Sequence, residues 1–212
     1  MAKRIAILGA GESGVGTAIL AKQKDYEVFV SDFGKITETY KDVLENFEIE
    51  WEENQHTASK ILNADVVMKS PGIPDKAPII KQLKDNKVAI VSEIEFASEF
   101  TNATIIGITG SNGKTTVTRW THHILKEGGL NASVGGNIGD SFAKQVAVNP
   151  SEYYVLELSS FQLDDIKDFR PHIAIITNIT PDHLDRYDYD FSKYVASKFR
   201  ITMNQTKDDY LI

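Results

Sequence analysis

An eight-residue stretch, residues 109–116 with the sequence TGSNGKTT, constrains the fold of this chain more than any other feature. The apolar run before it, residues 104–108, predicts a buried strand, and apolar residues at helical spacing after it predict a helix that ends at Gly128 and Gly129. A phosphate-binding loop requires this order of strand, glycine loop, Lys-Thr pair and helix, because free backbone N–H groups converge where the helix begins. The stretch therefore predicts an α/β domain that binds nucleotide phosphates.

The residue types in this loop indicate how it would hold a nucleotide. Lys114 would reach the terminal phosphates, and the hydroxyl of Thr115 would ligate a magnesium ion. The usual pattern has a glycine five positions before Gly113, where this chain has Ile108, so only the shorter G-x-x-G-K-T-T is present. Glycine loops that merely turn a strand into a helix are common, whereas Gly-Lys-Thr-Thr in this context is not. The residues predicted to contact the nucleotide are Gly110, Ser111, Asn112, Gly113, Lys114, Thr115 and Thr116.

Composition excludes several classes of function. The 212 residues carry a formal net charge of −7 and no Lys/Arg cluster, which argues against nucleic acid or an anionic membrane as the main partner. The absence of cysteine removes disulfides, thiol nucleophiles and cysteine-ligated metals. No apolar run is long enough to span a bilayer, and the first residues lead into a strand without the apolar core of a signal peptide. We therefore expect a soluble cytoplasmic protein.

A second glycine-rich turn lies near the N-terminus, at residues 9–14 with the sequence GAGESG. It follows a predicted strand at residues 4–8 and precedes a predicted helix, and the acidic Asp32 comes about twenty positions later. This is the G-x-G-x-x-G fingerprint of a Rossmann unit, in which the helix start binds a phosphate or diphosphate. The fingerprint alone also fits a purely structural turn or an NAD-dependent oxidoreductase, but an oxidoreductase leaves the later glycine-lysine loop unexplained.

Predicted strands and helices alternate along the rest of the chain, as in α/β folds. A polar break at residues 101–103 is the predicted boundary between a Rossmann-like domain, residues 1–100, and part of a P-loop ATPase domain, residues 101–212. The prolines of the SPGIP loop at residues 70–74 keep that loop out of a helix. Because the last predicted strand starts where the chain stops, we expect a longer protein. The further predicted strands are residues 26–31, 65–69, 88–91, 153–158, 173–176 and 209–212, and the further predicted helices are residues 78–85, 93–100 and 191–203.

Three polar features lie where predicted parallel strands end, and ligands bind at such ends in open parallel sheets. These features are the phosphate-binding loop, Glu157 and the Asp182-His183 pair, which can converge although they are far apart in sequence. A hydroxyl, a carboxylate and an imidazole around phosphates could ligate magnesium, with His183 the less expected ligand because this ion prefers oxygen. On residue type alone, Glu157 could equally be a hydrogen-bonded strand end and His183 a structural histidine.

Four motifs in order along the chain resemble those of the Mur ligase family. They are TGSNGKTT at residues 109–116, GGNIG at 135–139, LELSSFQL at 156–163 and NITPDHLDRY at 178–187. The N-terminal glycine turn and the SPGIP loop are similar to the uridine-nucleotide domain of that family, so the resemblance covers essentially the whole chain. It implies a three-domain protein with a Rossmann-like substrate domain, a central ATPase domain and a C-terminal amino-acid-binding domain. This chain would supply the first domain and part of the second.

More narrowly, the motifs resemble members of the family that add D-glutamate to UDP-N-acetylmuramoyl-L-alanine in peptidoglycan synthesis. The reaction that the resemblance implies is ATP-dependent amide formation. The alanyl carboxylate attacks the γ-phosphate to give an acyl phosphate and ADP, and the amine of D-glutamate then displaces phosphate. ATP and Mg²⁺ are the expected cofactors, and UDP-N-acetylmuramoyl-L-alanine and D-glutamate are the expected substrates. The expected state is a monomer without nucleic-acid or membrane partners, and this chain alone is expected to be inactive.

The resemblance also assigns roles to individual residues. Lys114 would hold the terminal phosphates, and Thr115 would ligate a first magnesium ion in a region shared with Glu157. His183 would ligate a second magnesium ion near the reacting carboxylate, and Lys198 matches a lysine that family members carry as a carbamate. The residues expected along the substrate are Ser13, Asp32 and Ser70 at the uridine diphosphate, and Asn137, Ser159 and His183 farther along.

The setting of Lys198 supports its assignment. Lys198 shares a predicted helix face with Tyr194 and Ile201, which are three or four residues away, whereas an ordinary helix lysine is solvated. Desolvation beside magnesium would lower the pKa of the ammonium and favour the neutral amine, which can add carbon dioxide.

Alternative functions remain open. The chain could belong to another Mur-type ligase that adds a different amino acid, or it could be a nucleotide-sensing module or a nucleotide-binding fragment without activity. Glu157 and His183 argue against sensing, because sensing needs no second metal ion.

Overall fold

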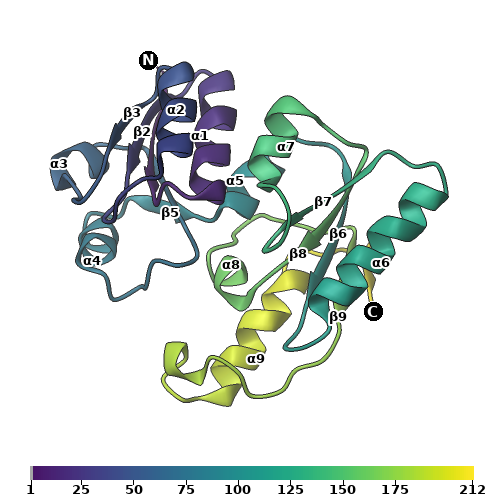
Figure 1. The fold of residues 1–212 in the computed structure, drawn as a ribbon. Coiled ribbons are helices and arrows are strands. Elements are labelled where there is room, and N and C mark those ends of the chain that lie inside the picture. Colours follow the sequence, from purple (N-terminus) through teal and green to yellow (C-terminus); the bar gives the residue numbers. More distant parts are fainter. Residues whose placement is uncertain (1) are drawn as a thin grey trace. The chain divides into compact units, whose positions relative to one another are not determined.

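Two parallel β-sheets organise the chain, one in each of two compact units (Figure 1). The structure, a computed structural model, describes residues 2–212. The first unit contains the residues up to Ala97 together with Ser141–Asn149, and the second contains Ser98–Asp140 and Pro150–Ile212. The chain therefore leaves the first unit after Ala97, returns to it for residues 141–149, and then completes the second unit.

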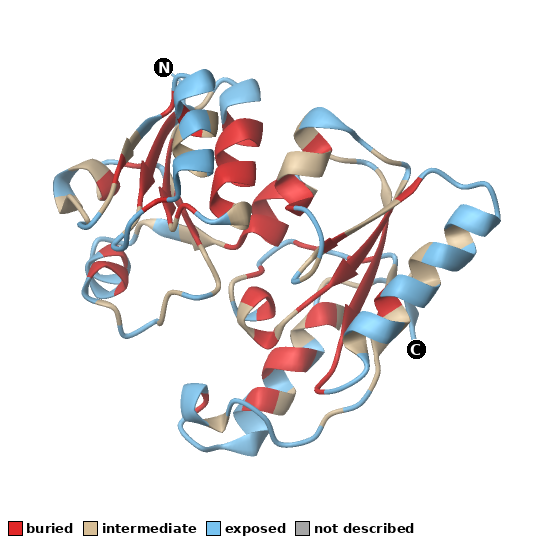
Figure 2. Cartoon of the chain, viewed as in Figure 1, coloured by how far each residue is buried: buried red, intermediate tan, exposed pale blue. Residues whose placement is uncertain are grey.

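The first unit is built on a parallel sheet with the strand order β3-β2-β1-β4-β5. Its central strand β1, Arg4–Leu8, is buried from Ile5 onward, as expected for a parallel strand that is covered on both faces. Figure 2 shows this buried core in red. The other elements of the unit are β2 Glu27–Ser31, β3 Glu50–Glu52, β4 Val66–Lys69, β5 Ala89–Val91, α1 Glu12–Gln23, α2 Glu38–Asn46, α3 Ala58–Ile61, α4 Pro78–Asp85, α5 Glu93–Ser98 and α7 Phe142–Val148.

Helix α1 is buried without interruption from Gly14 to Ala21, so it is covered on more than one side. Within the first unit it packs against α7 as well as against the sheet. Gly16 permits the close approach of α7, since a Cβ atom there would lie 1.9 Å from Oγ of Ser141. Gly14 permits the tight turn before α1, since its Cβ atom would lie 1.8 Å from the carbonyl oxygen of Gly9.

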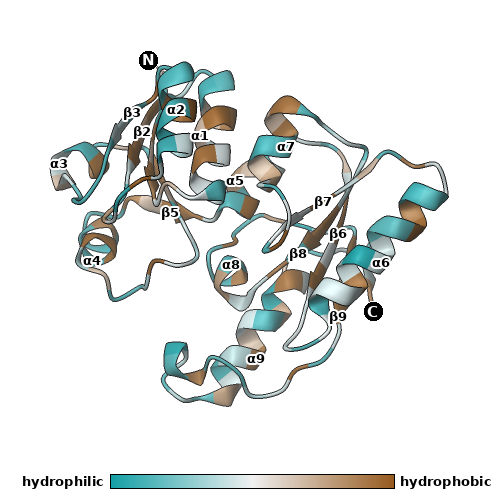
Figure 3. Cartoon of the chain, in the orientation of Figure 1, coloured by the Kyte–Doolittle hydropathy of each residue, from teal (hydrophilic) through white to brown (hydrophobic). Residues whose placement is uncertain are grey.

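The second unit is built around β6, Thr104–Thr109, in a parallel sheet with the strand order β10-β9-β6-β8-β7. The register places Ile108 opposite Glu157 of β8 and Thr109 opposite Ile176 of β9, so the carboxyl ends of these three strands meet at one edge. Figure 3 shows hydrophobic residues concentrated on the central strands. The other elements are β7 Ala132–Gly136, β8 Tyr153–Glu157, β9 Ile173–Ile176, β10 Tyr210–Leu211, α6 Lys114–Glu127, α8 Ser160–Asp164, α9 Phe191–Phe199 and the 3-10 helices η1 Leu184–Arg186 and η2 Arg200–Thr202.

The structure confirms the predicted α/β class with parallel sheets, and it adds elements that the sequence patterns do not predict. The additional elements are α2, β3, α3, β7, α7, α8 and η1. The helix predicted over residues 191–203 is helical as far as Thr202, but only residues 191–199 are α-helical, as α9, and residues 200–202 form the 3-10 helix η2. There the guanidinium of Arg200 donates to the carbonyl oxygens of Leu163 and Ile166, a tertiary contact that helical spacing cannot reveal. Within residues 2–212, no helix has the length and apolar character needed to cross a membrane.

The packing of α1 on α7 predicts that Gly16 is important for stability. We expect Gly16→Val to lower the free energy of unfolding by about 1–3 kcal/mol, because the new side chain would overlap Ser141 in a filled interface. Urea-induced unfolding measures the change. Gly72→Val is the matched control, since a Cβ atom at Gly72 meets nothing within 4 Å and the substitution should stay within about 0.5 kcal/mol. Equal unfolding midpoints for the two variants would contradict the packing argument.

Candidate active site

The loop between β6 and α6 has the geometry that phosphate binding requires. Gly110 and Gly113 have positive φ angles of 143° and 81°, and a Cβ atom at Gly110 would lie 2.0 Å from Oγ1 of Thr177. The loop is held by the segment after β9, because the backbone N–H of Ser111 donates to the carbonyl oxygen of Asn178 at 2.9 Å. No side chain caps the start of α6, which leaves the dipole of a 14-residue helix directed at the loop.

The side chain of Lys114 folds back over the loop between β6 and α6. Its Nζ donates to the carbonyl oxygens of Gly110 and Ser111, both at 2.9 Å. These two bonds place a positive charge beside the backbone N–H groups at the helix start. A bound phosphate would compete for the same ammonium, so the lysine is already within reach of the predicted phosphate site.

Glu157 connects the phosphate loop to the end of β7. Its Oε2 accepts a hydrogen bond from the hydroxyl of Thr115 at 2.7 Å, and its Oε1 accepts one from the amide of Asn137 at 2.8 Å. The carboxylate is almost completely buried. No group of three or more His, Cys, Asp or Glu within residues 2–212 could hold a metal ion by itself. A hydroxyl and a carboxylate nevertheless supply oxygen donors of the kind that magnesium takes when phosphates and water complete its shell.

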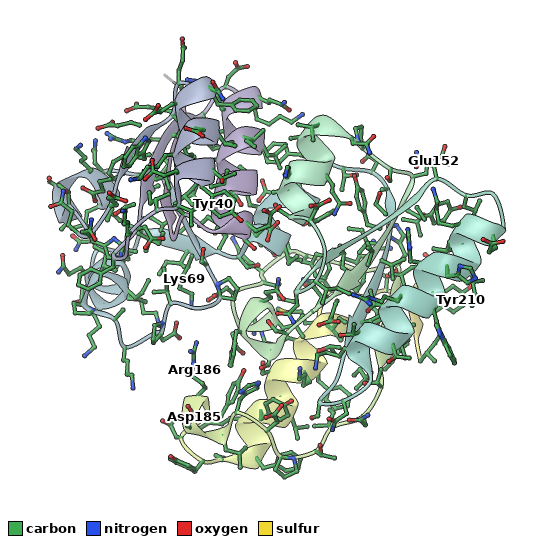
Figure 4. The ribbon with its side chains drawn as sticks, in the orientation of Figure 1. Tyr40, Lys69, Glu152, Asp185, Arg186 and Tyr210 are labelled. Carbon is green, nitrogen blue, oxygen red and sulfur yellow. The ribbon has the colours of Figure 1, made fainter. Side chains whose placement is uncertain are left out.

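A small cavity of about 130 Å³ lies within the second unit, next to Asn137, the partner of Glu157. His183 also lines this cavity, and its backbone is left-handed, with φ 49°, at the start of η1. The imidazole is held between the ring of Phe161, with centroids 5.2 Å apart, and the carboxylate of Asp182 at 3.6 Å. The guanidinium of Arg186, labelled in Figure 4, lies 4.3 Å from the centroid of the Phe161 ring. The predicted site residues that line the cavity are Lys114, Asn137, Ser159, His183 and Lys198.

Lys198 is a buried amine with few partners. It is 2% exposed, and its Nζ makes one hydrogen bond within residues 2–212, to Oγ1 of Thr109 at 3.2 Å. The ring of Tyr194 lies 5.3 Å from the same nitrogen. An ammonium has three N–H donors, so this pocket leaves it under-satisfied. Burial, followed by repulsion from Lys114, lowers the pKa of Lys198 to about 8, although nearby carboxylates oppose the shift.

The predicted uridine-diphosphate residues lie in the first unit, around the glycine turn at residues 9–14. Asp32 holds that turn, since its carboxylate accepts from the backbone N–H groups of Ala10 and Gly34, both at 2.7 Å. Asp32 also lines a cavity of about 490 Å³. Ser70 borders the turn, because a Cβ atom at Gly9 would lie 2.6 Å from its Oγ. Ser13 lies in the first turn of α1, next to the buried carboxyl of Glu93.

A family model described as the Mur ligase middle domain matches residues 108–212, and one described as the MurD N-terminal domain matches residues 4–79. The chain belongs to the Mur ligase family.

Relatives align with nearly the whole of this Mur ligase chain. A protein of Christiangramia forsetii named UDP-N-acetylmuramoylalanine--D-glutamate ligase is 66% identical, and proteins of the same name from Bacteroides thetaiotaomicron and Porphyromonas gingivalis are 57% and 56% identical. The alignments cover 100%, 99% and 98% of this chain and 48%, 47% and 46% of those proteins. The chain thus spans about half the length of the curated relatives it matches.

Solved structures of Mur-type ligases share the fold. UDP-N-acetylmuramate:L-alanyl-gamma-D-glutamyl-meso-diaminopimelate ligase from Neisseria meningitides has a TM-score of 0.67 at 22% identity, with 100% of this chain and 71% of that chain aligned. UDP-N-acetylmuramate-alanine ligase MurC from Thermotoga maritima has a TM-score of 0.58 at 23% identity, with 95% and 47% aligned. At these identities the likeness supports the fold alone.

The structure shows contacts around these candidate sites that the motifs of the Mur ligase family do not reveal. Thr109 holds the Lys198 nitrogen, and Tyr194 shares a hydrogen bond of 3.0 Å with Ser111 of the phosphate loop. Thr109 belongs to the recognised motif, but its link to Lys198 spans 89 positions and has no local signal. His56 lines the cavity of the first unit and belongs to none of the motifs.

The low pKa of Lys198 predicts a response to removing its positive neighbour. We expect Lys114→Met to raise the pKa of Lys198 above about 8, because losing a nearby like charge favours the protonated amine. A pH titration of the lysine ¹³Cε signals by NMR measures this pKa directly. Lys193→Met is the control on the same helix, since the Lys193 ammonium is exposed and paired with Asp188. A Lys198 pKa that is unchanged by Lys114→Met would contradict the electrostatic coupling.

Proposed function

We propose that this chain provides the uridine-nucleotide-binding and ATP-binding parts of a ligase that adds D-glutamate to UDP-N-acetylmuramoyl-L-alanine in peptidoglycan synthesis. The observation that carries the proposal is the contact of Thr115 with buried Glu157 at the end of a glycine-lysine loop. The names of relatives that are 66% and 57% identical over the chain support the same reaction. The substrates would be ATP, UDP-N-acetylmuramoyl-L-alanine and D-glutamate.

The main physical obstacle to this reaction is charge repulsion. A carboxylate must approach the γ-phosphate of ATP to form an acyl phosphate, and both groups are negative. The ammonium of Lys114 and the N–H groups at the start of α6 would hold the phosphate oxygens. Thr115 and Glu157 would hold Mg²⁺, which offsets the charge of the phosphates when it is bound. The chain thereby aligns the two anions without an extended basic surface.

The cavity beside Lys114 would receive the reacting carboxylate. Asn137 and Ser159 both line it. The amide of Asn137 donates one N–H to Glu157 and has a second N–H for that group, whereas the hydroxyl of Ser159 donates to Oε1 of Gln162 at 3.0 Å. His183 also lines the cavity and would ligate a second magnesium ion near the reacting carboxylate. In the first unit, Ser13, Asp32 and Ser70 would lie along the uridine diphosphate, which the glycine turn at residues 9–14 would hold by its backbone.

Lys198 would act as a carbamate. The neutral amine adds carbon dioxide and releases a proton, so a cation becomes an anion with two oxygen ligands and one N–H. That single N–H matches the single acceptor at Lys198, which is Oγ1 of Thr109. Thr109 can accept this bond because its own hydroxyl proton is donated to the carbonyl oxygen of Leu158 at 2.7 Å. The pocket therefore suits a carbamate better than an ammonium.

Two further proposals concern the setting of the reaction. A cytoplasmic, monomeric enzyme is proposed, because ATP and nucleotide-activated sugars are cytoplasmic metabolites and no Lys/Arg cluster marks a membrane partner. The alternative of a related ligase with a different amino-acid substrate is less favoured, since the relatives aligned over the whole chain carry the D-glutamate name.

The position of Lys114 in the phosphate loop predicts that its substitution reduces ATP turnover but leaves the fold intact. In a full-length ligase carrying this chain, we expect Lys114→Ala to reduce ATP turnover at least about 100-fold, because the charge that holds the terminal phosphates is gone. Lys126→Ala, at the far end of α6, should leave turnover unchanged. Phosphate release and thermal unfolding are measured for both variants. ATP turnover by Lys114→Ala close to that of the unmodified enzyme would refute the assignment.

The carbamate proposal predicts a chemical rescue. In the same full-length ligase, Lys198→Ala should lose activity and regain part of it when acetate or formate is added, because a small carboxylate can replace the missing anion. Lys193→Ala, five residues earlier on α9 and exposed, should be fully active and insensitive to the added acids. If Lys198→Ala keeps full activity, the lysine has no carbamate role.

A further inference from the structure

The cavity of the first unit has one polar ring on an otherwise largely apolar wall. Its walls come from the segments after β2 and β4, from the segment before α3 and from the start of α4. They include Asp32, Phe33, His56, Ile73 and Pro78. The side chain of Phe33 is 73% exposed, and its ring centroid lies 5.7 Å from that of His56. An exposed aromatic ring beside an imidazole provides a flat surface on which a planar base can lie.

A buried hydroxyl determines which nitrogen of His56 carries the proton. Oγ of Ser31 lies 2.7 Å from Nδ1 of His56, 2.7 Å from Oε1 of Glu52 and 3.3 Å from the carbonyl oxygen of Gln55. The carbonyl oxygen of Gln55 is an acceptor and cannot donate a hydrogen bond, and the same is true of the Glu52 carboxylate when it is ionised. The single proton of Ser31 is therefore directed at an acceptor, and the remaining contact requires Nδ1 of His56 to donate.

Glu52 is ionised in this network. Burial alone would raise the pKa of its carboxyl, but hydrogen bonds from the backbone and hydroxyl of Thr57, from Ser31 and from Gln55 outweigh burial and lower that pKa. The backbone N–H of Thr57 lies 2.7 Å from Oε1 and its hydroxyl lies 2.5 Å from Oε2. A carboxylate with this many donors keeps its charge at neutral pH, so the direction of the Ser31 hydroxyl is defined.

The other ring nitrogen of His56 is left as an acceptor. Burial lowers the pKa of His56, while the carboxylates of Glu52 and Asp32 oppose the shift, so the ring is neutral at neutral pH. A neutral imidazole that donates through Nδ1 has a lone pair on Nε2. Within residues 2–212, Nε2 has no hydrogen-bond partner, and it belongs to a residue that lines the cavity.

We propose that Nε2 of His56 accepts a hydrogen bond from the imide N3–H of a uracil ring in this cavity and thereby selects uracil over cytosine. The inference rests on the proposed function, which supplies a uridine nucleotide as the ligand. Uracil presents a donor at N3, whereas cytosine presents a lone pair there that would face the lone pair of His56. A site with a fixed acceptor rejects the base that lacks the matching donor. His56 is a specificity-determining residue, and Ser31 and Glu52 position it.

The tautomer is tested without any ligand. Two-dimensional ¹H–¹⁵N NMR of the imidazole rings in the 212-residue chain at pH 7.5 reports which nitrogen carries the proton. The protonated nitrogen of His56 should be Nδ1, and Ser31→Ala should weaken or abolish this preference because it removes the acceptor. A proton on Nε2 of His56 in the unmodified chain would overturn the inference.

Selectivity is tested with UDP and CDP as probes in titration calorimetry on the same chain. We expect His56→Ala to weaken UDP binding about 3- to 10-fold with little change for CDP, so that the preference for UDP collapses. His56→Gln should recover UDP binding but remain poorly selective, because an amide can present either an oxygen or an NH₂ group. His123→Ala, a surface histidine on α6, is the control and should bind UDP like the unmodified chain.

The outcomes separate this inference from the proposed function. Binding of UDP that His56→Ala leaves unchanged would overturn the role of His56 while the uridine site stands. Loss of UDP and CDP binding in equal measure would also overturn it, because His56 would then support the cavity without reading the base. If the unmodified chain binds neither nucleotide, the uridine site of the proposed function fails together with the inference, whichever tautomer is observed.

Discussion

The candidate site of the second unit depends on the hydrogen bonds that the buried carboxylate of Glu157 accepts. It stands at the end of β8 and accepts from Thr115 at the start of α6 and from Asn137 after β7. Gly136 is required beside it, because φ there is 93° and a Cβ atom would lie 2.3 Å from the carbonyl oxygen of Glu157. One carboxylate thus connects the phosphate loop to the GGNIG segment. A buried charge of this kind is tolerated only with strong partners, and both of its partners are residues of the site.

Charge is arranged locally because the chain as a whole is acidic. A net charge of −7 gives no general attraction for polyanionic nucleotides. The second unit instead offers the N–H groups at the start of α6 and two lysines, Lys114 and Lys198, which repel each other. That repulsion, added to burial, lowers the pKa of Lys198, so the same neighbour that would bind phosphate also makes Lys198 more reactive toward carbon dioxide.

The parts of the fold that can be predicted from sequence are those with strong local signals. Strands β1 and β6 are continuous apolar runs followed by glycine turns, and both are confirmed. The boundaries 1–100 and 101–212 remain a prediction. The sequence offers no local signal that α7 packs with α1, because that contact depends on Gly16 meeting Ser141, 125 positions away by their numbers. The motifs predict that Lys114, Glu157 and His183 lie near one another only because each lies at or after the end of a parallel strand of the same sheet. The contacts of Thr109 with Lys198 and of Tyr194 with Ser111 join residues far apart in the sequence, so only the structure shows them.

His56 shows why some site residues escape both motif and residue-type reasoning. Its role depends on the direction of one hydroxyl proton at Ser31, which depends in turn on the charge state of Glu52. None of the three residues is unusual alone. Together they convert an ambiguous imidazole, which could donate or accept at either nitrogen, into a group with one defined acceptor. The two units therefore solve different recognition problems. In the proposed sites, phosphates would be held by charge and backbone N–H groups, which any nucleotide could use, whereas discrimination between bases would come from the neutral imidazole of His56, whose proton is fixed by Ser31.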